Sequence, residues 1–283
     1  MPLTNVVNMK KPLDRGTTVD AKRYARWVSQ FSGYRNPVTN GMIELWLGQY
    51  SPKDGDLAAR TLDAILFVGH QHIHTSFREL LGSLDGWSKA KSKRRGRWFF
   101  VPFSGSVGES GDSMVHAFRM ATSMSKRQYN ELFVHRSELA VKKPGPNDTV
   151  VLVDDFSGTG TQATDAWKEF FAELLTEGPR VVLMIIAATQ HALSRIIDET
   201  EMEPICGTTL YDRDNIFDDE CPYFNAAEKK TLLEYCRRAD PKKPQGFGDT
   251  GLVVVFAHRC PNNSIPILHA ANNDWHGLFP RHD

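Results

Sequence analysis

The amino-acid sequence predicts an α/β protein, with a parallel β-sheet core, an N-terminal helical region and a C-terminal cap. Two observations support this fold class. After residue 97, continuous apolar runs of strand length alternate with segments of helix length, as in βαβ units. Before residue 90, apolar residues recur instead at the spacing of amphipathic helices. We therefore expect two domains, residues 1–90 and residues 91–283.

The composition agrees with a folded protein of ordinary charge. The chain has 283 residues, of which 41% are hydrophobic, so it can bury a sizeable core. Its 34 Lys and Arg residues balance its 34 Asp and Glu residues, so no overall field attracts nucleic acid or an anionic membrane. The four cysteines show no Cys-x-x-Cys spacing, no signal-like segment precedes the first helix, and the apolar runs are too short to span a bilayer. We expect a reduced, cytoplasmic protein with no membrane partner.

The N-terminal region is expected to form several short helices. Apolar residues follow helical spacing in three segments: residues 24–31, 57–66 and 77–84. Three histidines have alternate spacing: His70, His72 and His74. On a strand they would face one way and suit zinc, but Gly69 precedes them and a helical segment follows, so a polar turn explains them better.

A basic run separates the two expected domains. Lys and Arg occupy six of the nine positions from 89 to 97. Such a run can contact several phosphates and confer salt-dependent affinity for RNA or DNA. The alternative is a solvated linker, which the glycine in the run and the lack of an aromatic residue before Trp98 favour.

Four apolar runs after this linker have the length of strands: residues 98–101, 132–134, 149–153 and 181–186. Helices are expected beside them at residues 112–124, 161–175 and 191–199, and residues 204–210 are expected to be the last core strand. This order implies a parallel sheet covered on both faces. Ligands of such sheets bind beyond the carboxyl ends of the strands, where the segment after residue 153 lies.

The segment from Val150 to Gln162 carries the most specific signal. It reads Val-Val-Leu-Val-Asp-Asp-Phe-Ser-Gly-Thr-Gly-Thr-Gln. Asp154 and Asp155 supply acceptors that suit ribose hydroxyls or the water molecules of a magnesium ion. Two glycines allow a tight turn, and hydroxyl residues add donors at the start of the next helix, whose positive end favours an anion. An ordinary strand-to-helix turn with Asp155 as a helix cap rarely combines all of these features.

This segment resembles the motif with which type I phosphoribosyltransferases bind 5-phosphoribosyl-1-pyrophosphate (PRPP). The resemblance implies a phosphoribosyltransferase-like, Rossmann-like core. It implies that Asp154 and Asp155 are the catalytic residues that hold the ribose hydroxyls, with magnesium bound near them through the ligand and water. It also implies that six residues hold the 5-phosphate: Phe156, Ser157, Gly158, Thr159, Gly160 and Thr161. The sequence departs from the motif at Gly158, where a small hydroxyl residue is usual, and at Gln162, where a threonine is usual.

Two further segments correspond to loops of the same family. The strand that ends at Phe103 runs into a glycine-rich turn. The resemblance identifies this turn as the pyrophosphate loop: Ser104, Gly105, Ser106, Val107 and Gly108. The turn is followed by Glu109 and offers no cation, although the family often has one there. The segment before Asp148 has the place of the flexible catalytic loop, and three cations of this segment are candidates for reaching the ligand: Arg136, Lys142 and Lys143.

The C-terminal cap is expected to contact the base or another acceptor, because the corresponding segment of the family covers the site. Aromatic side chains suit stacking on a ring, although in a loop-rich cap they are more often core. Three are candidates: Tyr211, Phe217 and Trp275. The Asp-Asp motif, the Pro-Asn-Asn-x-x-Pro segment from Pro261 and the Trp-x-x-Leu-Phe-Pro-Arg segment from Trp275 are together similar to phosphoribosyltransferase-like domains of bacterial conflict systems, including retron-associated antiphage proteins. That resemblance implies an effector controlled by a partner protein or nucleoprotein.

The leading hypothesis is a magnesium-assisted enzyme that binds PRPP or a nucleoside 5′-phosphate. It would transfer the pentose, or cleave the N-glycosidic bond, at C1, and act as an antiphage defence effector. The alternative is a non-catalytic, nucleotide-sensing regulatory subunit that binds a partner protein or nucleic acid, which Gln162 and the lack of a cation in the second loop favour. A third hypothesis is an interaction subunit that binds RNA or DNA through residues 89–97. The acceptor, the activating partner and a homo-oligomeric state stay open.

Overall fold

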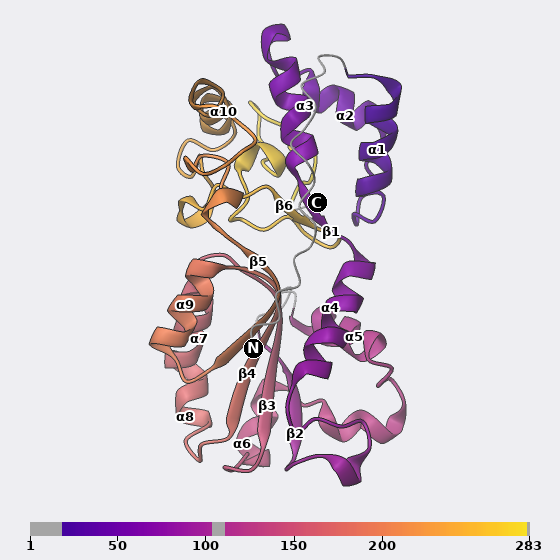
Figure 1. Ribbon diagram of the computed structural model, residues 1–283, viewed down its shortest axis with the longest axis vertical. Coiled ribbons are helices and arrows are strands. Elements are labelled where there is room, and N and C mark those ends of the chain that lie inside the picture. The colour runs from indigo at the N-terminus through magenta and orange to yellow at the C-terminus, as the bar shows by residue number, and fades with distance from the viewer. Residues whose placement is uncertain (1–18, 104–110, 282–283) are drawn as a thin grey trace. The chain divides into compact units, whose positions relative to one another are not determined.

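The structure, a computed structural model, describes residues 19–103 and 111–281. The chain divides into two compact units (Figure 1). Unit 1 comprises Met1–His70 together with Tyr211–Asp283, and unit 2 comprises Gln71–Leu210. The middle of the chain therefore forms one unit, and its two ends together form the other.

Unit 2 is built on a four-stranded parallel sheet in the order β2-β3-β4-β5. The strands are β2 (Trp98–Pro102), β3 (Thr149–Ser157), β4 (Arg180–Thr189) and β5 (Glu203–Leu210). Helices cover both faces, with α4 (His70–Ser83) and α5 (Gly111–Ala121) on one side and α7 (Thr161–Ala166) and α9 (Gln190–Glu199) on the other (Figure 1). Every residue of β2 and residues 149–154 of β3 are buried. Burial on both faces explains why these strands are continuous apolar runs in the sequence.

The helical segment after β3 has three parts: α7 (Thr161–Ala166), a π-helical turn (Trp167–Phe171) and α8 (Ala172–Leu174). Trp167 and Phe171 pack into the core of unit 2 together with Ile196 of α9 (Gln190–Glu199). Phe103 stacks on Phe171, with ring centroids 5.9 Å apart. These apolar contacts fix the helix that begins at the predicted phosphate loop.

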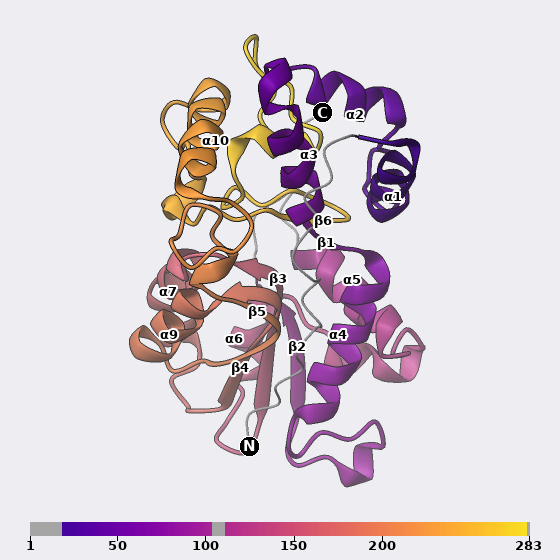
Figure 2. The same cartoon turned by 45° about the horizontal axis from the view of Figure 1, so that its top comes forward.

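Unit 1 combines elements from both ends of the chain: α1 (Ala21–Phe31), α2 (Asn40–Leu47), α3 (Gly55–Ala64), β1 (Leu66–Val68), α10 (Ala226–Ala239) and β6 (Val254–Phe256). β1 pairs with β6 in parallel, and Leu66 lies opposite Val254. The C-terminal segment lies between α10 and the N-terminal helices in both views (Figures 1 and 2). The buried Trp46 and Trp275 both donate their indole N–H to the Ile267 carbonyl, at 2.8 and 2.9 Å. The tail is therefore part of the core of this unit.

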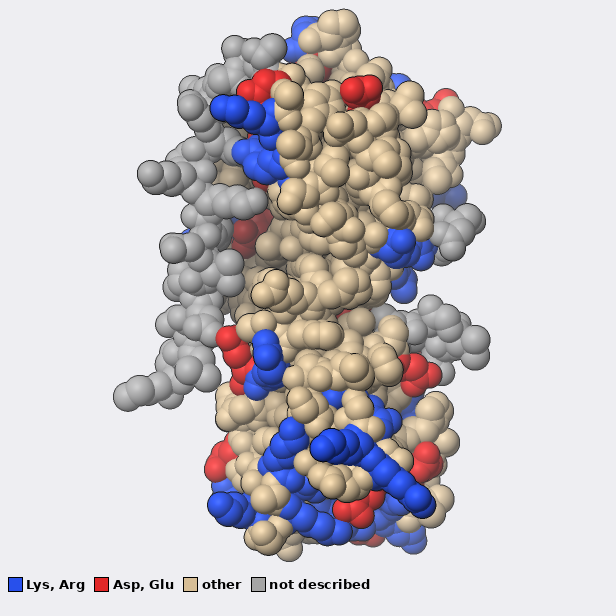
Figure 3. Space-filling model, turned by 90° about the vertical axis from the view of Figure 1, so that its right-hand side faces the viewer, with Lys and Arg blue, Asp and Glu red and all other residues tan. Residues whose placement is uncertain are grey.

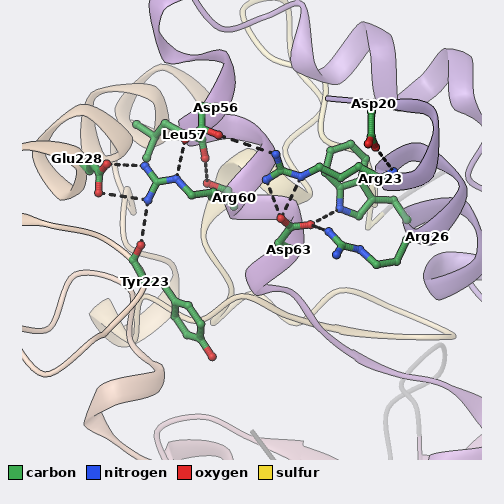
Figure 4. A network of polar contacts seen from close by, with 11 residues as sticks. Asp20, Arg23, Arg26, Asp56, Leu57, Arg60, Asp63, Tyr223 and Glu228 are labelled. Atoms are coloured by element: carbon green, nitrogen blue, oxygen red, sulfur yellow. Dashed lines mark hydrogen bonds and ion pairs between the residues drawn. The ribbon is translucent and has the colours of Figure 1, made fainter. Parts of the chain in front are cut away.

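A buried carboxylate joins α1 to α3 within unit 1 (Figure 4). Asp63 is only 8% exposed. It accepts hydrogen bonds from three side chains of α1: Arg23 (2.6 Å), Arg26 and Trp27 (2.7 Å). One turn earlier on α3, Arg60 pairs with Glu228 of α10. These pairs link three helices of the unit through hydrogen-bonded charges.

The remaining short elements are α6 (Leu139–Lys142) and the 3-10 helices η1 (Pro52–Asp54), η2 (Lys91–Lys93), η3 (Arg127–Leu132), η4 (Arg136–Glu138), η6 (Asp212–Asp214), η7 (Phe247–Asp249) and η8 (Pro266–Leu268). Across residues 19–103 and 111–281, none of the helices is both long enough and apolar enough to cross a membrane.

The structure confirms the predicted α/β class with a parallel sheet. Residues 132–134 do not form the expected strand, because they end a 3-10 helix and make only one isolated bridge, between Phe133 and Phe100. The division into units also differs from the boundary expected near residue 90. The N-terminal helices and β1 pack with the C-terminal cap, and hydrophobic periodicity reports local structure but not such long-range pairing.

Candidate functional site

The two predicted acids lie near the carboxyl end of β3. This strand runs beyond Val153, where it was expected to end, so the acids and Phe156 belong to the strand. Asp154 is 7% exposed, and Asp155 is half-buried. The strand is longer than predicted because backbone pairing with β4 continues regardless of side-chain polarity, and Phe156 lies opposite Ala187.

The sheet is irregular at the acidic pair. Asp154 lies opposite Ile185, and the Asp155 N–H donates to Asp154 Oδ1 at 3.0 Å. Ile185 and Ala188 of β4 both belong to the core on the α7 side, although side chains on one face of a regular strand lie an even number of positions apart. The alternation of side chains between the two faces of the sheet is therefore shifted between Ile185 and Ala188. Regular alternation would direct adjacent carboxylates to opposite faces of the sheet. The register of β3 with β4 skips Asp155, so this alternation is interrupted at the acidic pair.

A three-residue turn joins β3 to α7: the predicted loop is shorter than expected because β3 extends to Ser157, whereas the helix begins at Thr161 as predicted. Gly158 and Gly160 are buried, and Thr159 is half-buried. Gly160 has a φ of +74°, and a Cβ there would lie 3.1 Å from the carbonyl oxygen of Ala192 in α9. Both the backbone conformation and the neighbouring helix therefore require glycine at this position.

The start of α7 has the features of an anion site. Its N-cap residue is Gly160, which makes no side-chain hydrogen bond to the first turn. Thr159 Oγ1 accepts only a long hydrogen bond, 3.4 Å, from the Thr161 N–H. The next N–H groups, of Gln162 and Ala163, have no intrahelical acceptor because they lie in the first turn. Together with the positive end of the helical segment 161–174, they favour a bound phosphate.

The end of β4 and the helix α9 after it supply contacts that sequence reasoning missed. Arg195 of α9 donates through Nη1 to Thr161 Oγ1 at 2.8 Å and through Nε to Glu199 at 2.8 Å. Thr189 donates to the Gly158 carbonyl at 2.7 Å and caps α9. A guanidinium therefore lies at the start of α7. The order of strands and helices in the sequence could have predicted this contact between α9 and α7, because right-handed crossovers place the helices after β3 and β4 side by side.

Two of the three cations expected in the flexible loop lie away from the acids. Three were candidates: Arg136, Lys142 and Lys143. The Arg136 guanidinium lies over the Phe170 ring, 4.4 Å from its centroid. The carbonyls of Lys142 and Lys143 accept hydrogen bonds from Arg97, which directly precedes β2. The backbone of these two lysines is therefore at the amino ends of the strands, the opposite edge of the sheet from the acidic pair.

The other predicted site residues have different outcomes. Residues 104–108, the predicted pyrophosphate loop, lie outside the described residues. Tyr211 follows the end of β5 directly and is exposed, and Phe217 is half-buried, so both stay candidates for contact with an acceptor. The prediction that Trp275 stacks on an acceptor ring is wrong, because this side chain is fully buried in the core of unit 1 and its indole N–H donates to a backbone carbonyl.

Two further titratable side chains belong to unit 2. His72 lies 3.2 Å from the Thr208 hydroxyl of β5, and burial lowers the pKa of its imidazole. Burial raises the pKa of Cys206 to about 12. At neutral pH this imidazole is therefore uncharged and this thiol protonated. Within the described ranges, no three His, Cys, Asp or Glu residues form a metal cluster, and the three alternate histidines lie in the first turns of α4 instead.

Unit 2 also carries a strongly basic surface (Figure 3). Segments 85–97 and 119–131 hold nine Lys or Arg residues and two Asp or Glu residues. The segments touch each other, since Lys89 donates to the Thr122 carbonyl at 3.1 Å and Lys91 pairs with Glu131 at 2.9 Å. The basic surface is defined by their exposed cations: Lys89, Lys91, Lys93, Arg95, Arg97, Lys126 and Arg127. Segment 85–97 directly precedes β2, and segment 119–131 touches it, so the surface lies away from the carboxyl ends of the strands.

Comparison with known proteins agrees with this geometry. The PRTase-CE family model matches residues 43–281, from α2 through both units. The chain belongs to the PRTase-CE family. This membership confirms the phosphoribosyltransferase-like domain that the Asp-Asp motif indicated. No curated protein matches the chain.

Among solved structures, the chain is similar to the crystal structure of TT1426 from Thermus thermophilus. The identity is 20%, the match covers 36% of this chain and 45% of that chain, and the TM-score is 0.20. The matched region is thus less than half of that protein, and the function of this PRTase-CE chain is argued below from its own residues.

Proposed function

We propose that the chain binds PRPP or a nucleoside 5′-phosphate at the carboxyl end of β3. One observation carries this proposal: two carboxylates lie near the end of β3, and the next helix starts three residues beyond that strand without a side-chain cap and beside the Arg195 guanidinium. Asp154 and Asp155 would accept hydrogen bonds from the ribose hydroxyls. The first-turn N–H groups of α7, with Arg195, would hold the 5-phosphate. Membership of the PRTase-CE family supports this ligand class.

With the phosphate and the hydroxyls held, C1 of the ribose is the reacting atom. The bond from C1 to pyrophosphate or to a base breaks, and the leaving group takes the electron pair. In pentosyl transfer, an acceptor nitrogen forms the new bond to C1 and loses a proton. In N-glycosidic cleavage, water adds to C1 instead, and the products are the free base and ribose 5-phosphate. The carboxylates beside the ring would stabilise the positive charge that develops on it.

Magnesium fits the same site through its ligand. Asp154 and Asp155 are adjacent hard oxygen donors, and the described residues add no third acid to make a metal cluster. This arrangement suits an ion that is bound by one or two carboxylates together with water and ligand phosphates. When bound, magnesium would neutralise charge on a departing pyrophosphate.

Calorimetry with PRPP and with AMP tests the binding step. We expect both carboxylates to matter, since a hydrogen bond to a charged group contributes about 1.5–3 kcal/mol. The Asp154→Asn, Asp155→Asn double variant should therefore bind at least about tenfold more weakly than the wild type. Asp165→Asn is the matched control, because Asp165 is exposed on α7. A folded wild-type protein that binds neither ligand would refute the proposal.

Turnover separates the enzyme from the sensor alternative. Incubation with a nucleotide pool, followed by mass spectrometry, should show release of free base or pyrophosphate by the wild type and not by the double variant. Binding without any product would instead support the nucleotide sensor. We also propose an effector role in antiphage defence, which the similarity of the tail segments to conflict-system proteins supports. In a plaque assay, the double variant should then fail to protect cells.

The basic surface favours a nucleic-acid partner as a second function of unit 2. The chain is neutral overall, so this concentration of charge is local. Three of its cations make no ion pair, side-chain hydrogen bond or ring contact within the part of the chain that the structure describes: Lys93, Lys126 and Arg127. Cations without internal partners are available to contact phosphates of an RNA or DNA backbone.

Fluorescence anisotropy with a single-stranded oligonucleotide tests this surface. Changing these three cations to Glu should weaken binding at least about tenfold and reduce the slope of log affinity against log salt by about 2, since each phosphate contact contributes about 0.7 for a single strand. The same charge change at three exposed lysines of unit 1 is the control: Lys22, Lys53 and Lys230. Equal losses in both variants would point to non-specific attraction and remove this function.

A further inference from the structure

A cavity lies entirely within unit 1 and contains none of the β3 site residues. Its volume is about 420 Å³, and the end of α10, η8 and the C-terminal tail line it. Small-molecule sites have volumes of roughly 300–1,000 Å³. The polar side chains that line it are Asp240, Lys242, His269, Asn272 and Arg281.

Arg281 is the informative residue of this cavity. It is half-buried, and its Nε is a buried donor without a hydrogen-bond partner. Among the residues of the described ranges, none forms an ion pair with it. Burial lowers the pKa of Arg281, and the nearby Arg259 guanidinium lowers it further. A guanidinium that is withdrawn from water without a counter-ion is costly, so this position calls for an anion.

The other lining residues do not supply that anion. Asp240 is the one acid of the cavity lining, and its Oδ1 already accepts hydrogen bonds from the N–H groups of Lys242 (2.9 Å) and Lys243 (3.2 Å). Burial, together with the charge of Arg281, lowers the pKa of His269 to about 4, so this imidazole is neutral at pH 7. Lys242 adds a second positive charge to the lining. The cavity is therefore cationic.

We infer that this cavity binds the phosphate group of a small molecule, with the Arg281 guanidinium and the Lys242 ammonium as its cationic contacts. A planar guanidinium matches the oxygens of phosphate through two parallel hydrogen bonds, and a dianion balances both cations. Inorganic phosphate and a phosphorylated metabolite share this chemistry. Since the residues belong to unit 1 alone, the inference is independent of the function proposed for the β3 site.

Thermal unfolding of the full chain, with and without millimolar inorganic phosphate or AMP, tests the inference. Phosphate should raise the Tm of the wild type and leave the Tm of Arg281→Met unchanged. Without phosphate, Arg281→Met should be at least as stable as the wild type, because an apolar side chain of similar length removes an unpaired buried charge. An arginine with a merely structural role would instead give a lower Tm in the variant. Arg281→Lys keeps the charge without the planar fork, and calorimetry should show about tenfold weaker phosphate binding.

Two controls complete the design. Arg237→Gln on α10 removes an exposed arginine that pairs with Glu234 at 2.8 Å, and it should keep the full response to phosphate. The Asp154→Asn, Asp155→Asn variant should also keep it. If that variant loses the response, if Arg281→Met keeps it, or if phosphate and AMP both leave the wild-type Tm unchanged, the inference is overturned. In the Asp154→Asn, Asp155→Asn variant, whose β3 site is weakened, a larger effect of AMP than of phosphate would identify a phosphorylated metabolite as the source of the group.

Discussion

Gly160→Ala tests whether the turn after β3 depends on the close contact between the Gly160 backbone and α9. Two effects oppose a side chain at this position: the φ of +74°, and a Cβ that would lie 3.1 Å from the Ala192 carbonyl oxygen. The left-handed conformation costs a non-glycine residue about 1–2 kcal/mol. A crowded contact that forces its neighbour to move adds about 1 kcal/mol. We therefore expect the free energy of unfolding to fall by about 2–3 kcal/mol.

Gly178→Ala is the matched control for this substitution. Gly178 has a φ of +70°, but no atom lies within 4 Å of the added Cβ, so only the conformational cost of about 1–2 kcal/mol applies. Urea unfolding of both variants gives the difference. Because α9 also carries Arg195, its displacement should weaken PRPP or AMP binding in Gly160→Ala and not in Gly178→Ala. Equal destabilisation of the two variants would show that the contact with α9 contributes nothing.

Three other predictions concern single side chains. Asp63→Asn should lower the free energy of unfolding by about 3 kcal/mol in a urea titration, because the Arg23 side chain, only 12% exposed, loses its carboxylate partner. The control is Asp56→Asn: the Asp56 side chain is 36% exposed, so the same titration should show a loss of less than about 1 kcal/mol. The pKa of His269 lies at about 4 in the folded chain against 6.5 for an unperturbed histidine, so the unfolded chain takes up a proton first as the pH falls. Stability should therefore drop by at most about 3 kcal/mol between pH 6.5 and pH 4, and a His269→Gln variant with the same pH profile would contradict this reasoning. Arg195→Met should weaken AMP binding in calorimetry by about tenfold, and Arg195→Lys by less, whereas an unchanged affinity would mean that the guanidinium does not touch the ligand.

The core of unit 2 could be predicted from the sequence because its signals are local. Strands β3 and β4 are continuous β-branched or aliphatic runs, and the helices after them have amphipathic spacing. The end of β3 could not be predicted, since Asp154 to Ser157 look like a loop in the sequence while their backbone still pairs with β4. Strand ends depend on the neighbouring strand, which a single segment does not reveal.

The candidate site was predictable in its motif and not in its surroundings. The Asp-Asp pair, the glycines and Thr161 lie together because they are consecutive. Arg195 reaches Thr161 across 34 positions of sequence, and only the packing of α9 beside α7 brings them together. The reverse holds for Lys142 and Lys143, which precede β3 closely in the chain but lie at the other edge of its sheet. Nearness in sequence predicts contact only within one element or turn.

The pairing of β1 with β6 determines the order in which the molecule can mature on the ribosome. Residues 71–210 emerge before Val254–Phe256 have been synthesised, so the sheet of unit 2 can form while Leu66–Val68 still lacks its partner. The nascent chain therefore exposes an apolar strand edge until Val254–Phe256 have been synthesised, and unpaired strand edges of this kind are prone to aggregation. A protein truncated shortly after residue 210 would contain the complete sequence of unit 2, but its β1 strand would have no partner and would be prone to aggregation.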